Sequence, residues 1–306
     1  MREGRHGQGP GRGSRRRGRR PSGQGSAPHL QEPHADHGAA RAPRSGRPAV
    51  TAPNRNPVIK RVAGRLDVRV FSDRAQSGAA AAGAAATALR TALATRGEAR
   101  VVFAAAPSQR ETLAGLRAAE GIDWSRVVVF HMDEYLGLPA GASQRFGRFL
   151  RHELWDAVRP GAVHVIEPGG DPEAECARYA ELLGRGPIDL VCLGIGDNGH
   201  LAFNDPPVAD FGDPLAVKVV ELDDASRRQQ VGDGCFATLA DVPERAITLT
   251  VPTLMAGRTL VATVPGASKK AALAAALDGP VAESCPASVL RTHPDCTLFA
   301  DLEAYP

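Results

Sequence analysis

The sequence has few cysteines and no long apolar run, and these absences exclude several classes of protein. Its five cysteines are an odd number without a Cys-x-x-Cys pair, which argues against a disulfide framework and a structural zinc site. No apolar stretch approaches the roughly 20 residues of a membrane span, and no apolar segment of a secretory signal follows the arginine-rich start. We therefore expect a cytoplasmic protein that does not enter a membrane.

Positive charge is concentrated at the start of the chain. Residues 1–55 contain twelve arginines and three acidic residues, whereas the remainder contains 25 basic and 31 acidic residues. This Gly- and Pro-rich segment has little to bury, so it cannot offset the entropy cost of ordering. We predict a disordered basic tail over residues 1–58 and one folded domain over 59–306. The arginine run at 15–20 has no interleaved aromatic residues, so we expect no specific nucleic-acid binding.

The rest of the chain alternates short apolar runs with longer helical segments. Strands are predicted at 67–71, 101–106, 126–130, 188–194, 246–251 and 259–264, and helices at 73–96, 109–120, 143–157, 171–184 and 268–277. This alternation predicts a single α/β domain with a mainly parallel, doubly wound sheet and helices on both faces.

Three polar loops follow predicted strands, at 106–110, 131–137 and 194–206. Functional residues of such folds gather beyond the carboxyl ends of the strands, so we expect these loops to meet. The second loop contains the acidic pair Asp133 and Glu134. One of these carboxylates could instead cap the next helix.

The third loop combines glycines with a histidine and a carboxylate. Glycines at 194, 196 and 199 permit a tight turn close to a ligand. His200 follows, and Asp205 lies five residues later. A carboxylate beside an imidazole fixes its tautomer and raises its basicity, so this loop predicts a proton-transfer site.

Two motifs together resemble the glucosamine-6-phosphate deaminase family. They are Met-Asp-Glu-Tyr at 132–135 and Gly-Ile-Gly-Asp-Asn-Gly-His-Leu-Ala-Phe-Asn-Asp-Pro at 194–206. The segment 264–269, Val-Pro-Gly-Ala-Ser-Lys, is similar to the family's phosphate-binding lysine segment. The resemblance covers residues 66–306. The related 6-phosphogluconolactonases share the fold and a Gly-His loop but lack the Met-Asp-Glu-Tyr and Phe-Asn-Asp-Pro stretches.

The resemblance implies conversion of glucosamine 6-phosphate and water into fructose 6-phosphate and ammonia, without a metal or an organic cofactor. Asp133 matches the base that moves a proton from C2 to C1, and His200 matches the residue that opens the sugar ring. Asp205 stands where the family usually has Glu. Substrate or phosphate contacts are expected from Ser108, Gln109, Gly199, Arg228 and Lys269. Some members are oligomers, so a homo-oligomer is also expected.

Three departures from the family pattern leave two alternatives open. Asn198 replaces the aspartate that polarises the histidine in well-studied members, so slower ring opening or a different substrate is expected. The usual Gly-Gly-Thr phosphate loop is replaced by the sequence at 105–109, and the phosphate-binding arginine falls at Gly232, with Arg227 and Arg228 nearby. The alternatives are a 6-phosphogluconolactonase-like hydrolase and a catalytically weak sugar-phosphate-binding protein.

Overall fold

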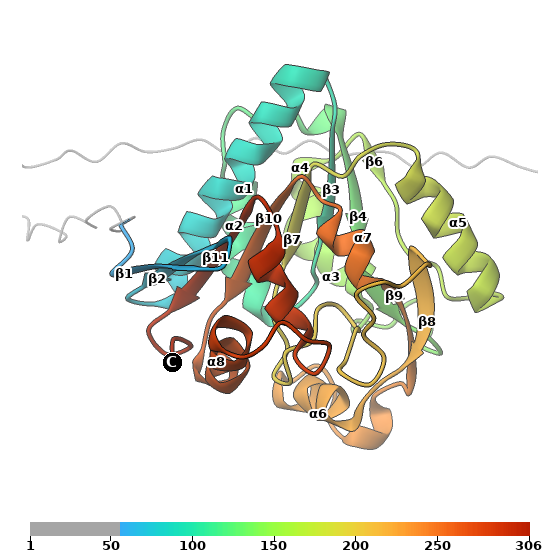
Figure 1. Ribbon diagram of the computed structural model, residues 1–306. Helices are drawn as coiled ribbons and strands as arrows, with labels where there is room; N and C mark the ends of the chain where they lie inside the picture. The colour runs from blue at the N-terminus through green and yellow to red at the C-terminus, as the bar shows by residue number, and fades with distance from the viewer. Residues whose placement is uncertain (1–55) are drawn as a thin grey trace, which may run out of the picture. The chain divides into compact units, whose positions relative to one another are not determined.

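The computed structural model describes residues 56–306, which belong to one compact unit (Figure 1). Apart from its last three residues, the predicted tail lies outside the described residues. The main sheet has eight strands in the order β1-β2-β11-β10-β7-β3-β4-β6. Their bounds are β1 Ile59–Ala63, β2 Leu66–Phe71, β3 Ala99–Phe103, β4 Val127–His131, β6 Ala162–Val163, β7 Leu190–Leu193, β10 Thr259–Val264 and β11 Cys296–Asp301.

Neighbouring strands of this sheet are parallel, except that β1 and β2 form an antiparallel pair. Both faces of the sheet are buried, as β7 shows: Leu190 and Cys192 pack into one apolar core, Val191 and Leu193 into the other. A parallel sheet that is buried on both faces needs helices over each face. The predicted α/β class with a mainly parallel sheet is confirmed.

Helices cover both faces (Figure 1). Helices α1 (Arg74–Arg96) and α2 (Arg110–Arg117) pack on one core, whereas α5 (Pro172–Gly184), α7 (Val251–Met255) and α8 (Lys270–Asp278) pack on the other. The predicted helix at 73–96 is α1, whose N-terminus is capped by Asp73 and whose end is marked by Gly97 at φ 81°. Among the described residues, none of the helices combines the length and apolarity needed to cross a membrane.

A second, three-stranded antiparallel sheet lies beside the active-site edge. It consists of β5 (Asp133–Tyr135), β9 (Arg245–Leu249) and β8 (Val217–Glu221), in that order. The strand predicted at 246–251 therefore exists as β9, but it does not belong to the parallel sheet. The 131–137 segment was expected as a loop and instead contains β5. The apolar run of β9 has the same pattern whether the strand belongs to a parallel or an antiparallel sheet. Strand β5 has only three residues, two of them acidic, so its sequence does not show the pattern of a strand.

The remaining elements connect these layers. The predicted helix at 143–157 is observed as α3 (Phe146–Leu150), a π-helical turn at Arg151–Trp155 and α4 (Asp156–Val158). Helix α6 spans Asp224–Gly232. Short 3-10 turns lie at Pro107–Gln109, Trp124–Arg126, Leu239–Asp241, Ala267–Lys269 and Pro286–Thr292.

Candidate active site

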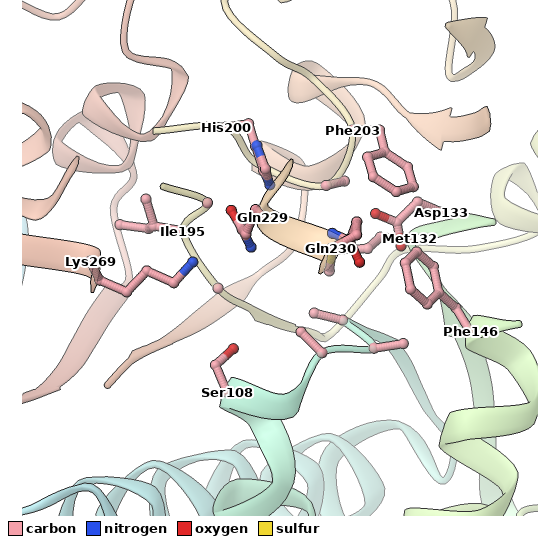
Figure 2. A pocket seen from close by; sticks show the side chains of 16 residues that line it. Ser108, Met132, Asp133, Phe146, Ile195, His200, Phe203, Gln229, Gln230 and Lys269 are labelled. Carbon is pink, nitrogen blue, oxygen red and sulfur yellow. The ribbon is translucent and has the colours of Figure 1, made fainter. Parts of the chain in front are cut away.

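The three predicted polar loops meet at one cavity at the carboxyl edge of the parallel sheet (Figure 2). Strands β3, β4, β7 and β10 all lead toward it. The lining residues are Ala104, Ala105, Ala106, Ser108, Met132, Asp133, Phe146, Gly194, Ile195, Gly196, His200, Ala202, Phe203, Gln229, Gln230 and Lys269.

The acidic pair on β5 has two separate roles because successive side chains of a strand point in opposite directions. Glu134 points away from the cavity and accepts hydrogen bonds from the backbone N–H groups of Phe146 at 3.1 Å and Gly147 at 3.2 Å. It therefore caps α3. Asp133 lines the cavity. The helix-capping alternative thus applies to Glu134 and not to Asp133.

The Asp133 carboxylate is buried without a compensating partner. Its residue is 7% exposed, and within residues 56–306 no hydrogen bond or ion pair reaches its carboxylate. Burial raises the pKa of Asp133 well above its usual range, and the neighbouring charge of Glu134 raises it further. Once ionised, such a carboxylate is a strong proton acceptor.

His200 and Asp205 form a buried pair on the glycine-rich loop. Nδ1 of His200 lies 2.9 Å from Oδ1 of Asp205. Burial alone would raise the pKa of Asp205, but the close contact with His200 and its charge, together with the amide of Asn198, outweigh it and lower the pKa. An ionised carboxylate at Nδ1 keeps the proton on that nitrogen and leaves Nε2 to exchange protons with a ligand.

Asn198 supports this pair from the side. Its Nδ2 donates to Oδ1 of Asp205 at 2.8 Å, and its Oδ1 accepts from the backbone N–H of His200 at 3.1 Å. The structure places Asp205 beside the histidine as expected for a carboxylate partner, while the slower ring opening or different substrate expected from Asn198 stays a prediction. The loop folds back so that Asp205 supplies the carboxylate, and Asn198 orients it.

Two glycines of this loop shape the site in different ways. A Cβ on Gly196 would lie 2.1 Å from Nε2 of His200, so the absence of a side chain gives the imidazole its place. Gly199 has φ 85°, and its added Cβ would lie 2.8 Å from Sγ of Cys285. Gly199, expected to contact substrate, instead turns the backbone and does not line the cavity.

The residues expected to bind phosphate divide into two groups. Ser108 and Lys269 line the cavity. Gln109 does not, because its buried amide donates to the backbone carbonyl of Thr263 at 3.2 Å. Arg228 also does not: its side chain is 66% exposed and pairs with Asp224 at 3.1 Å. Gln109 and Arg228 are thus corrected to positions outside the cavity.

The sequence reasoning missed two lining residues, Gln229 and Gln230 of α6. They follow Arg228 directly, but each residue of a helix is rotated by about 100° from the previous one. Gln229 also accepts a hydrogen bond, on its Oε1, from the backbone N–H of Asp197 at 2.7 Å. No sequence signal shows which side of this polar helix faces the cavity.

No group of three or more His, Cys, Asp or Glu side chains within residues 56–306 is arranged to hold a metal ion. The site instead consists of a free carboxylate, a histidine–carboxylate pair and one lysine. In a doubly wound fold, groups of this kind at the carboxyl edge of the sheet can exchange protons with a bound ligand. The family model of glucosamine-6-phosphate isomerases and 6-phosphogluconolactonases matches residues 72–299, and the chain belongs to this family.

Individual relatives agree with this assignment. Glucosamine-6-phosphate deaminase of Bacillus cereus (strain G9842) is 37% identical over 186 residues, which cover 60% of this chain and 68% of that protein. The enzyme of the same name from Bacillus thuringiensis (strain Al Hakam) is 36% identical over the same coverage. The expected cytoplasmic location and homo-oligomer stay predictions.

Solved structures show the same fold. A monomeric glucosamine-6-phosphate deaminase superposes with a TM-score of 0.71 at 26% identity, covering 78% of this chain and 98% of its own. The 6-phosphogluconolactonase of Thermotoga maritima superposes with a TM-score of 0.63 at 18% identity, covering 77% and 99%. At 18% identity, the likeness to the lactonase shows a shared fold and nothing about activity.

Proposed function

We propose that the protein converts glucosamine 6-phosphate and water into fructose 6-phosphate and ammonia. The observation that carries this proposal is that Asp133 and His200 line the same cavity (Figure 2), with His200 paired to Asp205. An aldose–ketose isomerisation needs one group to open the ring and another to move a proton between carbons. The cavity offers one group for each task.

Ring opening is assigned to His200. Its Nε2 transfers a proton between the C1 hydroxyl and the ring oxygen, which breaks the C1–O5 bond and leaves an open-chain aldehyde. Asp205 holds the other ring nitrogen, so the imidazole keeps one tautomer and one orientation. Asn198 and Gly196 position this pair, the first by its hydrogen bonds and the second by leaving space.

Proton transfer between carbons is assigned to Asp133. The carboxylate removes the C2 proton to give the enolate of the amino aldehyde and returns the proton to C1, while one proton of the amino group passes to O1 to form the C1 hydroxyl. The resulting C2 imine reacts with water, which releases ammonia and leaves the C2 ketone of fructose 6-phosphate. A buried carboxylate of raised pKa suits this step, because it is a stronger base than a solvated carboxylate.

Phosphate binding is assigned to the side of the cavity that holds Lys269 and Ser108, away from Asp133 (Figure 2). C6 and C2 lie toward opposite ends of a hexose chain, so a phosphate at Lys269 places C1 and C2 toward Asp133. Ser108 adds a hydroxyl near the start of α2, where backbone N–H groups favour an anion.

A coupled assay tests the proposal. In the first assay, purified protein is given glucosamine 6-phosphate, and ammonia and fructose 6-phosphate are measured together. In the second assay, the same protein is given 6-phosphogluconolactone, and acid release is measured. We expect ammonia and fructose 6-phosphate in equal amounts, with His200→Ala inactive and Arg228→Ala active as the control. Acid release without ammonia would indicate the lactonase, and ligand-induced thermal stabilisation without turnover would indicate the binding protein.

A further inference from the structure

The phosphate-binding lysine already has an anionic partner within the protein. Nζ of Lys269 lies 2.6 Å from Oδ1 of Asp197, and the lysine side chain is 7% exposed while that of Asp197 is 39% exposed. Asp197 also accepts a hydrogen bond from Ser268 Oγ at 3.4 Å, and its backbone N–H donates to Gln229. The carboxylate is thus fixed on a buried ammonium group and remains open to solvent.

No other strong cation compensates for this pairing. Among residues 56–306, Lys269 is the only lysine or arginine that lines the cavity. Arg227 donates to the backbone carbonyls of Leu239 and Val242, and Arg228 pairs with Asp224. An incoming phosphate therefore meets a lysine whose charge is already balanced by a carboxylate.

We infer that Asp197 competes with the sugar phosphate for Lys269 and so sets how tightly the site holds phosphate. This inference rests on the proposed function, because it takes the Lys269 side of the cavity as the phosphate site. A phosphate monoester carries a charge of about −1.5 to −2 near pH 7 and offers three acceptor oxygens. It can displace a single carboxylate from the ammonium group, whereas a neutral hydroxymethyl group cannot. Asp197 thereby weakens phosphate binding at Lys269.

Binding measurements without turnover test this competition. Inorganic phosphate and fructose 6-phosphate, the latter without ammonia, are titrated calorimetrically into wild type, Asp197→Asn, Lys269→Met and the double variant. Asp224→Asn is the matched control, because it removes a carboxylate that is paired with Arg228 outside the cavity. Asp197→Ser serves if the asparagine variant does not fold.

We expect Asp197→Asn to bind both ligands about fivefold more tightly, since a partly exposed ion pair contributes up to ~1 kcal/mol. Lys269→Met should bind at least about tenfold more weakly. In the Lys269→Met background, Asp197→Asn should have no further effect. Equal or weaker binding by Asp197→Asn, or the same gain in both backgrounds, would overturn the inference.

Failure of this inference can be distinguished from failure of the proposed function. Suppose that the protein releases no ammonia, but Asp197→Asn binds phosphate more tightly and this gain disappears in the Lys269→Met background. The deaminase assignment then fails and the competition stands. If ammonia is released and Asp197→Asn does not bind phosphate more tightly, the deaminase assignment stands and the competition is refuted.

Discussion

Replacing Asp133 with asparagine separates catalysis from stability more clearly than any other change in this protein. The substitution is nearly isosteric but removes the only carboxylate that lines the cavity within residues 56–306. A positioned general base typically contributes 10²–10⁴-fold to the rate, which corresponds to about 2.7–5.4 kcal/mol of barrier. We therefore expect Asp133→Asn to lose about 10²–10⁴-fold in kcat while it still binds fructose 6-phosphate.

The same variant should be at least as stable as wild type. Burial raises the pKa of Asp133 in the folded protein, so ionising this carboxylate disfavours the folded state. The penalty is absent below the ordinary carboxyl pKa and grows as pH rises toward the folded pKa. Asp133→Asn should therefore raise the melting temperature more at pH 8 than at pH 5. The kcat/KM of wild type should rise with pH above the ordinary carboxyl range, because the base must be ionised.

Ammonia release by steady-state assay and thermal melts at both pH values check these expectations. Full activity in Asp133→Asn would remove the base from the mechanism and the deaminase assignment with it. A lower melting temperature at pH 8 would show that Asp133 stabilises the fold and would refute the electrostatic reasoning.

Three further predictions concern groups around the base. Gly196→Ala should lose at least about 10²-fold in kcat, because its Cβ would displace the imidazole of His200. Gly232→Ala is the control and should stay active, because its Cβ would meet no atom within 4 Å. Equal activities of the two variants would contradict this. Asn198→Asp replaces an amide donor to Asp205 by a second carboxylate. Urea denaturation should show that the free energy of unfolding falls by about 1–3 kcal/mol at pH 7 and by less at pH 4. An unchanged unfolding midpoint would refute this prediction. Glu134→Ala leaves backbone N–H groups of α3 without an acceptor and should cost about 1–3 kcal/mol in the same assay; an unchanged midpoint would contradict the capping role.

Much of the fold could be predicted because the main sheet has a strong local pattern. The buried strands β3, β4, β7 and β10 are mostly apolar, and α1 has both a capping aspartate and a terminal glycine. The small antiparallel sheet could not be predicted as a unit. Strand β5 pairs with β9 across more than 100 positions, as Asp133 does with Thr248, and nothing local marks that pairing.

The site was predictable where a motif brings its residues together along the chain. His200, Asp205 and Asn198 lie within eight residues of one another, and Lys269 ends the recognisable segment 264–269. The direction of each side chain was not predictable. Asn198 seemed to replace a needed carboxylate, although the turn at Gly199 brings Asp205 onto the imidazole. Arg228 faces solvent because of its position around α6, which composition does not show.

The central claim is that Asp133 moves a proton from C2 to C1 of an amino-sugar phosphate. Turnover of glucosamine 6-phosphate deuterated at C2 tests it most directly, with ammonia followed over time and the product analysed by NMR. The account predicts one ammonia per fructose 6-phosphate, a slower rate than with the unlabelled sugar, and deuterium found only at C1 of the product or in solvent. Ammonia release with an aldose product that keeps its deuterium at C2, or no ammonia at all, would contradict it.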